Sequence, residues 1–167
     1  FMCAIDANRA DLRGADLSFA QMQGAVLNGA HLEGAYLFTT QLQGANLTAV
    51  SAENAEFRDC QLEYASLKAA DLEGVKGLSA DQLRQSYGSM AGGVKTCIPS
   101  QLHAPDHWFT PPVEERHQLF EYFDFNQAFQ SWLDEQPDFP EISDFWMIRD
   151  GTAGGDIVQR MDLFQPD

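Results

Sequence analysis

One cysteine and two histidines near the middle of the chain are the residues whose types and spacing come closest to a chemical site. Cys97, His103 and His107 lie close together in the sequence, and thiolate and imidazole groups can bind zinc or form a nucleophile–base pair. Pro105 separates the two histidines, which argues against their ligating one ion from a single helix. We therefore interpret all three side chains as structural.

Other signatures of catalysis are absent from the sequence. It contains no G-x-S-x-G nucleophile motif and no H-E-x-x-H metal motif. The glycine-rich stretch 150–156 lacks the lysine of a phosphate-binding loop and the alternating acids of a calcium loop. We expect a protein that is not an enzyme and needs no cofactor; the alternative is an unrecognised activity in residues 110–167.

Charge and composition exclude further classes of function. The formal net charge is −15, and no cluster of Lys and Arg suggests direct contact with nucleic acid phosphates. No run of 18 apolar residues predicts a membrane-spanning helix. The acidity favours a basic protein partner, or simply solubility.

The cysteines and the N-terminus bear on where the protein resides. Three cysteines, Cys3, Cys60 and Cys97, form no complete disulfide set and have no metal-ligand spacing, so we expect reduced thiols in the cytoplasm. No basic stretch followed by an apolar one predicts a signal peptide at the N-terminus. A chain that begins at Phe1 favours the interpretation that it is a piece of a longer protein.

A five-residue repeat occupies the first half of the chain. From Ala10 the sequence reads as 13 consecutive units, beginning ADLRG, ADLSF, AQMQG, AVLNG and ending with ADLEG at Gly74. The third position of each unit is almost always Leu, and the first is Ala in ten units. Ile5 and Ala7 indicate a degenerate earlier unit. A period of five fits neither a helix nor an ordinary strand.

This A(D/N)LxX pattern closely resembles the pentapeptide-repeat family. The resemblance implies an all-β solenoid, a right-handed quadrilateral β-helix with four walls and about 20 residues per coil, hence a little over three coils here. The small first residue and the central Leu would point inward, while the other three positions point outward. Coils would stack at the strand spacing of roughly 4.8 Å, so that stability is a sum over neighbouring coils.

The fifth position of each unit should form a corner of the coil. Gly or Asn occupies it at every second corner, for example at Gly14, Gly24 and Asn54. Because these residues tolerate a positive φ, we expect that conformation at alternate corners. Gly29 falls outside this series and Tyr64 breaks it.

Residues 20 apart should stack in columns on the outside of the solenoid. One column carries Glu33, Glu53 and Glu73, which is either a solvated acidic surface or a docking strip for a basic partner. Stacked glutamines on another wall, in the columns 21/41/61 and 23/43, should hydrogen-bond to one another. Tyr36, Phe38 and Phe19 form an exposed aromatic group, which either binds a partner or is covered by the chain's own C-terminal half; we favour covering.

The chain after the repeats divides into two parts in our interpretation. Residues 78–109 are a helical cap and a proline-containing linker, and residues 110–167 are an acidic, aromatic, α-rich extension; residues 1–77 are the repeat domain. Ser79 and Gln82 predict a capping box for a helix that ends near Tyr87. The segment from Thr96 to Trp108, of the form T-x-x-P-x-x-L-x-x-P-x-H-W, resembles a tail that follows bacterial pentapeptide repeats.

The extension contains one clear amphipathic stripe. Phe125, Ala128, Phe129, Trp132 and Leu133 follow helical spacing, after a helix start predicted at Asp124. An earlier helix start is predicted at 110–115, and a β-hairpin at 145–161. The stripe would pack on the solenoid or on a second copy, which makes a homodimer through the extension one hypothesis.

The leading functional hypothesis is a non-catalytic scaffold that binds a protein partner of unknown identity, with neither nucleic acid nor membrane contacted directly. The candidate partner-binding residues are Phe19, Tyr36, Phe38, Glu33, Glu53, Glu73, Phe125, Phe129 and Trp132. The family resemblance implies an alternative, a DNA mimic that binds DNA gyrase, a type II topoisomerase. The acidic column agrees with it, but a solenoid of about 16 Å is shorter than the long rods of those relatives.

Overall fold

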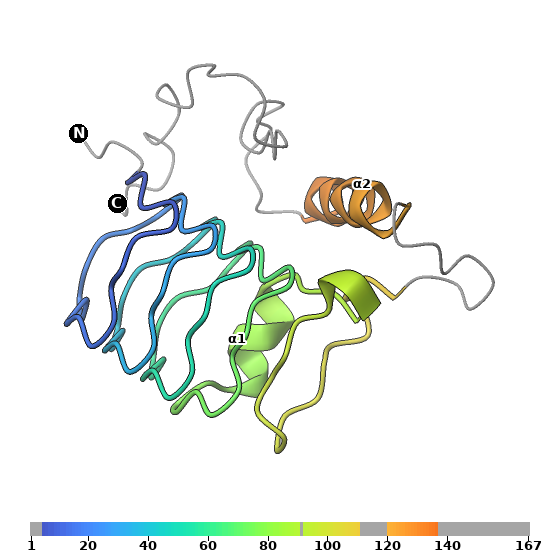
Figure 1. The fold of residues 1–167 in the computed structure, drawn as a ribbon. Helices are drawn as coiled ribbons and strands as arrows, with labels where there is room; N and C mark the ends of the chain where they lie inside the picture. The colour runs from blue at the N-terminus through green and yellow to red at the C-terminus, as the bar shows by residue number, and fades with distance from the viewer. Residues whose placement is uncertain (1–4, 91, 111–119, 137–167) are drawn as a thin grey trace.

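A square solenoid makes up most of the molecule (Figure 1). The computed structural model describes residues 5–90, 92–110 and 120–136, without the side chains of 120–126. Each wall pairs with the next coil through single parallel bridges between residues 20 apart, as in the column Asp11, His31, Ser51 and Asp71. The lone bridges arise because two of the five residues in each unit form a turn, which leaves one residue per unit to pair.

Each repeat unit of residues 25–49 makes the same three kinds of backbone hydrogen bond to neighbouring coils, and the units on either side make at least one of them. The third and fifth residues donate their N–H groups to the next coil, as Leu12 does to the His31 carbonyl at 2.8 Å and Gly14 to the Glu33 carbonyl at 3.0 Å. The second residue donates to the preceding coil, as His31 does to the Ala10 carbonyl at 2.9 Å. The backbone of the inner coils is therefore satisfied coil by coil, as the resemblance implied.

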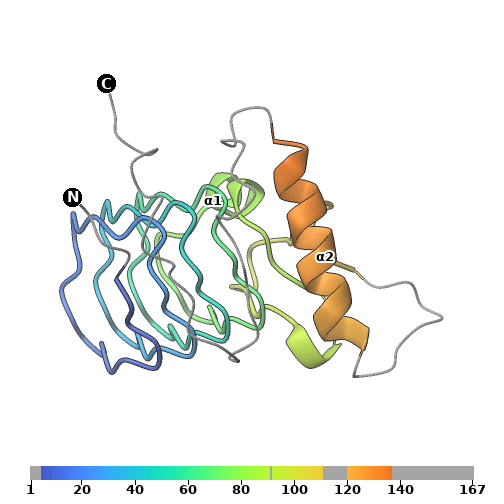
Figure 2. The ribbon, with the colours of Figure 1, turned by 90° about the horizontal axis from the view of Figure 1, so that it is seen from above.

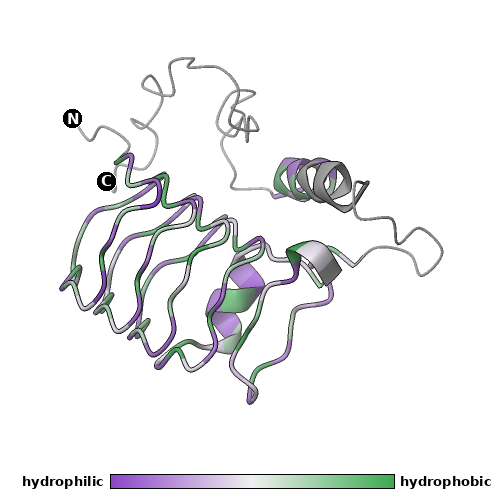
Figure 3. Cartoon of the chain, in the orientation of Figure 1, coloured by the Kyte–Doolittle hydropathy of each residue, from purple (hydrophilic) through white to green (hydrophobic). Residues whose placement is uncertain are grey.

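The interior of the solenoid is a column of leucines flanked by alanines. Leu32, Leu37 and Leu47 have no exposed surface, and neither do the first-position alanines Ala30 and Ala35. Apolar and polar residues alternate along each coil in Figure 3, in line with inward and outward positions. The first unit, from Ile5, is confirmed as part of the solenoid because Asp6 pairs with Val26.

The positive φ predicted at alternate corners is confirmed, but the rule was too narrow, because every corner from Arg9 to Gly74 has a positive φ. Eight of these residues are not glycine, among them Phe19, with a φ of 61°, and Ala69, with a φ of 55°. In each case the N–H that follows the corner bonds back across the turn, as from Ala10 to the Ala7 carbonyl at 3.0 Å. The closed square requires the same turn at each corner, whichever residue occupies it.

Helix α1, Ala80–Gln85, follows the last repeat. Its predicted capping box is present: Ser79 Oγ accepts from the Gln82 N–H, and Gln82 Oε1 accepts from the Ser79 N–H. The Gln82 amide also donates to the carbonyls of Phe57, at 3.0 Å, and Cys60, at 2.7 Å. These bonds hold α1 against the coil. The helix ends before the predicted Tyr87, whose backbone pairs with the wall at Ser66.

Backbone pairing continues beyond the repeats. Tyr87 pairs with Ser66 and Cys97 with Asp71, and Phe109 then pairs with Ser89. The short 3-10 helix η1, Gly92–Val94, lies between these bridges, and the Val94 carbonyl accepts from the Ala69 N–H at 2.9 Å. Residues 85–109 thus add a winding to the solenoid although they lack the repeat. The division of the chain at residues 77 and 109 remains a prediction.

Helix α2, Phe120–Asp134, lies beside the last windings in both ribbon views (Figures 1 and 2). Asp124 is inside it, so the predicted helix start there is wrong. The predicted start at 110–115 falls mainly, and the predicted hairpin at 145–161 wholly, outside the described residues. Neither α1 nor α2, the two α-helices in the described ranges, is long and apolar enough to cross a membrane.

Candidate interaction surfaces

The four walls of the solenoid expose four different kinds of side chain. Walls ten residues apart in the sequence lie on opposite sides of a square coil of 20. The wall of Asp16 and Tyr36 is therefore opposite the wall of Asn46 and Ser66, and the wall of Asp11 and His31 is opposite the wall of Gln21 and Gln41. Each wall is a separate candidate for binding.

The aromatic patch, which we define as Phe19, Tyr36 and Phe38, is the most exposed apolar feature of the described surface. The three side chains are 67%, 53% and 37% exposed. Phe19 and Phe38 come from successive coils and meet edge to face, with ring centroids 5.4 Å apart. They are outward because they occupy the second, fourth and corner positions of their units. This places the three predicted aromatic residues together on one side of the first two coils.

The described part of the C-terminal half does not cover the aromatic patch. Helix α2 packs instead against Tyr64, Tyr87 and Phe109, by the wall opposite the patch. The exposed Arg58 follows Phe38 in the same column, one coil further along. Lys76 also lies on this wall, paired with Glu56 at 3.6 Å. The patch is thus an apolar surface with cationic groups at its C-terminal side.

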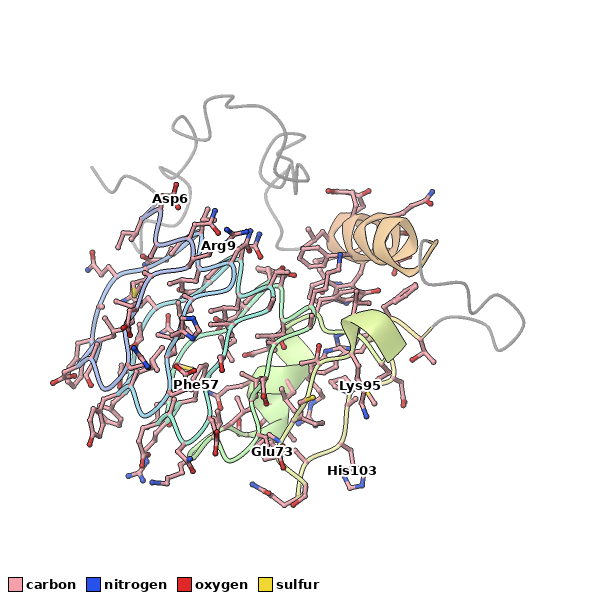
Figure 4. All side chains as sticks on the ribbon, viewed as in Figure 1. Asp6, Arg9, Phe57, Glu73, Lys95 and His103 are labelled. Carbon is pink, nitrogen blue, oxygen red and sulfur yellow. The ribbon has the colours of Figure 1, made fainter. Side chains whose placement is uncertain are left out.

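The acidic column is only partly as the sequence predicted. Glu53 and Glu73 are exposed, whereas Glu33 is half-buried and lies 3.2 Å from His31 Nδ1. Glu53 Oε1 accepts from the Asn54 side chain at 3.2 Å. Figure 4 shows Glu73 on the outside of the coil. Two carboxylates of the column, rather than three, are therefore exposed to solvent.

Glutamines form the predicted hydrogen-bonded ladder on the opposite wall. The Gln23 amide donates to Gln41 Oε1, and the Gln43 amide donates to Gln61 Oε1. The bonds therefore run between neighbouring columns and not along one column. The ladder supports stacking of the coils, although Gln23 Oε1 and Gln43 Oε1 are buried without a hydrogen-bond partner among the described residues.

The apolar stripe of helix α2 packs against the inside of the molecule. Phe129 and Leu133 are buried, and Phe129 stacks on Tyr87 with ring centroids 5.1 Å apart. Trp132 is half-buried between His107, at 5.2 Å, and Tyr64, at 6.1 Å. The Phe125 side chain lies outside the described residues. Phe129 is therefore unavailable to a partner while α2 is docked, and Trp132 is partly available.

The residues first considered for chemistry are structural in their contacts. The His107 ring lies 2.9 Å from the Ser86 carbonyl through Nε2, and the buried Trp108 donates to the same carbonyl at 3.1 Å. Cys97 is exposed, and burial raises the pKa of the Cys60 thiol to about 12. Within the described ranges no group of His, Cys, Asp and Glu side chains could hold a metal ion.

The tail motif explains how the last winding is attached. Thr96 Oγ1 donates to the Leu67 carbonyl at 2.6 Å and accepts from the Ser89 N–H at 3.0 Å. The Trp108 ring lies over Gly88, where an added Cβ would meet the ring at 2.6 Å. Sequence reasoning noticed Thr96 and Trp108 but missed Gly88 and Tyr87, since their roles depend on segments that meet only in the folded chain.

Comparisons with known proteins agree with the repeat. The family model described as pentapeptide repeats matches residues 5–38 and 40–76, in eight copies. No curated protein matches the chain. One similar solved structure is HetL, a pentapeptide repeat protein involved in heterocyst differentiation regulation in Nostoc sp. strain PCC 7120. It is 34% identical with a TM-score of 0.42 over 42% of this chain, which spans only 33% of HetL.

Two further solved structures are pentapeptide repeat proteins. One comes from the thylakoid lumen of Arabidopsis thaliana, with 22% identity, a TM-score of 0.43, and coverage of 68% of this chain and 70% of that one. The other, Rfr23 from the cyanobacterium Cyanothece 51142, has 26% identity, a TM-score of 0.33, and coverage of 60% and 64%. The repeat units, their family match and the square coil together show that residues 5–76 of this chain are a pentapeptide-repeat domain.

Proposed function

We propose that this protein is a non-catalytic scaffold whose protein partner docks on the aromatic patch. Pentapeptide-repeat proteins are typically non-catalytic interaction scaffolds. The observation that carries the proposal is the exposure of Phe19, Tyr36 and Phe38 on a solenoid whose interior leucines are fully buried. Exposed aromatic groups of this kind are typical of binding surfaces.

The surroundings of the patch support a partner with apolar and acidic groups. Arg58 and Lys76 lie on the same wall, toward the C-terminal end. An apolar side chain of the partner would cover Phe19 and Phe38, and a carboxylate beside it would meet Arg58. Arg at the margin of an aromatic patch favours carboxylates through paired hydrogen bonds.

The proposal is tested by affinity capture from a lysate of the source organism, read by quantitative mass spectrometry. The bait is the full chain, compared with Phe19→Glu/Phe38→Glu and with Asn8→Glu/Gln21→Glu, which adds the same charge at exposed positions on two other walls. We expect one protein to be lost at least about tenfold with the first variant only, which corresponds to roughly 1.4 kcal/mol. Equal capture by all three baits would remove the patch from the proposal.

A DNA-gyrase modulator is the second candidate, and the exposed Glu53 and Glu73 are the observation in its favour. The solenoid has about five layers in the column from Asp6 to Tyr87, roughly 20 Å at strand spacing, which is short for imitating a DNA duplex. A supercoiling assay at micromolar protein separates the candidates. Inhibition that Glu53→Gln/Glu73→Gln abolishes would favour the mimic, and unchanged supercoiling would exclude it.

A further inference from the structure

The aromatic patch extends along the solenoid axis, across successive coils. Phe19 lies in the first described coil, Tyr36 and Phe38 lie in the next, and Arg58 follows one coil later. Phe19 meets Phe38 edge to face across the two coils, and Arg58 occupies the same column as Phe38. Because coils stack at roughly 4.8 Å, the wall presents a large outward side chain at each of three successive coils.

The two ends of the patch carry opposite charges. At the N-terminal side, Asp16 is exposed and begins the column that continues through the patch. At the C-terminal side, Arg58 is exposed and has no ion-pair partner among the described residues, whereas Lys76 is paired with Glu56. The exposed Asp59 at the adjacent corner is likewise not paired with Arg58. A carboxylate of a ligand would therefore be attracted at the Arg58 side and repelled at the Asp16 side.

The backbone of the patch has no open strand edge for an extended ligand. The Tyr36 N–H donates to the Ala15 carbonyl at 2.9 Å, and the Tyr36 carbonyl accepts from the Leu17 N–H at 2.8 Å. A ligand strand would therefore cover the aromatic rings without backbone partners of its own. A proline-rich segment requires a groove between aromatic rings, and the contact of Phe19 with Phe38 leaves no such space between them.

Helix α2 shows how this solenoid holds a helix with aromatic side chains. Tyr87 stacks on Phe129 of α2 with ring centroids 5.1 Å apart, and Tyr64 lies 6.1 Å from Trp132. Phe19 occupies the same corner position in its unit as Tyr64, and both residues have a φ of 61°. A helix pairs its own backbone groups, so only its side chains need partners on such a surface.

We propose that the partner segment that docks on the aromatic patch is an amphipathic α-helix with an acidic end, lying along the solenoid axis. This inference rests on the proposed function, because it specifies the partner at the same site. One helical turn rises about 5.4 Å, close to the coil spacing of roughly 4.8 Å, so successive turns meet successive coils. An apolar side chain at position i contacts Phe19, a second at i+4 contacts Phe38, and a carboxylate at i+7 or i+8 lies over Arg58.

Peptide display on the full chain tests the proposal with two libraries of roughly 20 residues. Both are randomised at positions i, i+4, i+7 and i+8. One has a helix-forming framework of Ala, Gln and Lys, and the other has prolines in the framework, which prevent a helix. Binders to Phe19→Glu/Phe38→Glu are removed by counter-selection. We expect enrichment of the helical library alone, with apolar residues at i and i+4 and Asp or Glu at i+7 or i+8.

A charge exchange between the selected peptide and Arg58 locates the acidic end of the helix. Arg58→Glu should weaken binding at least about tenfold in calorimetric titration, and replacing the acid of the peptide by Lys should restore most of the affinity for this variant. Lys95→Glu is the matched control, since Lys95 is exposed and lies at the other end of the molecule (Figure 4). It should change the affinity by less than about threefold.

Enrichment of only the proline library, or of neither library, would overturn the proposal of a helical partner. Helical binders whose affinity survives Phe19→Glu/Phe38→Glu, or whose charge exchange brings no recovery, would also overturn it. The lysate capture described above keeps the two proposals separate. A protein that is lost with Phe19→Glu/Phe38→Glu, but contacts the patch through a segment that is not helical in the complex, would support the proposed function and overturn the helix alone.

Discussion

The last repeats of the solenoid and its first described coil differ in how far they are covered. At the C-terminal end, residues 85–97 pair with the last repeats, α1 is held by Gln82, and Trp108 is buried. In the first described coil, Ile5 is exposed and Leu12 and Leu17 are only partly buried. Repeats bury one another only where they have a neighbour. At the C-terminal end, residues outside the repeat therefore supply the neighbour that the last repeats need.

The largest expected difference between the ends follows from removing one aromatic ring at each. Trp108→Ala should lower the free energy of unfolding by about 3–5 kcal/mol, because a fully buried ring and its hydrogen bond are lost. Phe19→Ala should cost less than about 1 kcal/mol, because Phe19 is largely exposed. Urea denaturation followed by circular dichroism measures both. Similar losses of unfolding free energy for the two variants would mean that the packing of Trp108 stabilises the protein no more than the exposed Phe19 ring does.

A smaller effect is expected from the hydroxyl that attaches the last winding. Thr96→Val keeps the shape of the side chain but removes its bonds to the Leu67 carbonyl and the Ser89 N–H. We expect a loss of about 1–3 kcal/mol, because buried polar groups are left unsatisfied. Thr96→Ser keeps the hydroxyl and should recover most of this stability in the same denaturation experiment. No recovery would point to lost packing of the methyl group instead.

Corner substitutions should show no difference between the ends. Arg9 has a φ of 54° and Ala69 a φ of 55°, a conformation that is strained for any residue with a Cβ. Arg9→Gly and Ala69→Gly should each raise the free energy of unfolding by about 0.5–1 kcal/mol. Thermal unfolding of both variants checks this, with Gly34→Ala as the control that should lower stability. If one glycine variant raised the free energy of unfolding and the other lowered it, the strain at the turn could not have a purely local origin.

The smallest expected effect is on the pH dependence of stability in the first coil. Hydrogen bonds from Arg13 lower the pKa of Asp11 to about 2 from its ordinary value of 3.8. The folded pKa lies below the unfolded one, so the contribution of Asp11 is present above pH 3.8 and is lost as the pH falls through about 2. Asp11→Asn should reduce this acid dependence slightly, since the pair is exposed. Denaturation of the unmodified chain and of Asp11→Asn between those pH values measures this difference. If the free energy of unfolding depended on pH in the same way for both, Asp11 would not be the source of the acid dependence.

Periodic features of this fold could be predicted from the sequence with good success. The unit length, the inward leucines and the stacking of residues 20 apart all follow from a repeat that each unit specifies for itself. The capping box of Ser79 and Gln82 was also predictable, because it depends on four consecutive residues. The corner conformation was predicted only in part, because Gly and Asn were taken as the signal for positive φ. Closure of the square imposes that conformation on Phe19 and Ala69 as well.

The candidate surfaces were predicted less completely. Phe19, Tyr36 and Phe38 were expected to be neighbours, and the structure places Phe19 against Phe38. Glu33 was expected to face solvent with Glu53 and Glu73, but it is half-buried beside His31. Phe129 was a candidate for partner binding within a stripe expected to pack on the solenoid or on a second copy, and the structure stacks it on Tyr87 inside the molecule. Whether a side chain points outward is set by its position in the repeat unit. Its exposed area depends on which other segments of the chain pack against it.

The sequence by itself determined the square coil, its core and the direction of each side chain, because each five-residue unit carries its own wall and turn. Only the tertiary structure decided which outward residues are covered and how the C-terminal end of the solenoid is closed. Those outcomes depend on contacts between distant segments, such as Trp132 with His107 and Thr96 with Leu67. No repeat encodes such contacts, since their free energy arises only when the segments meet.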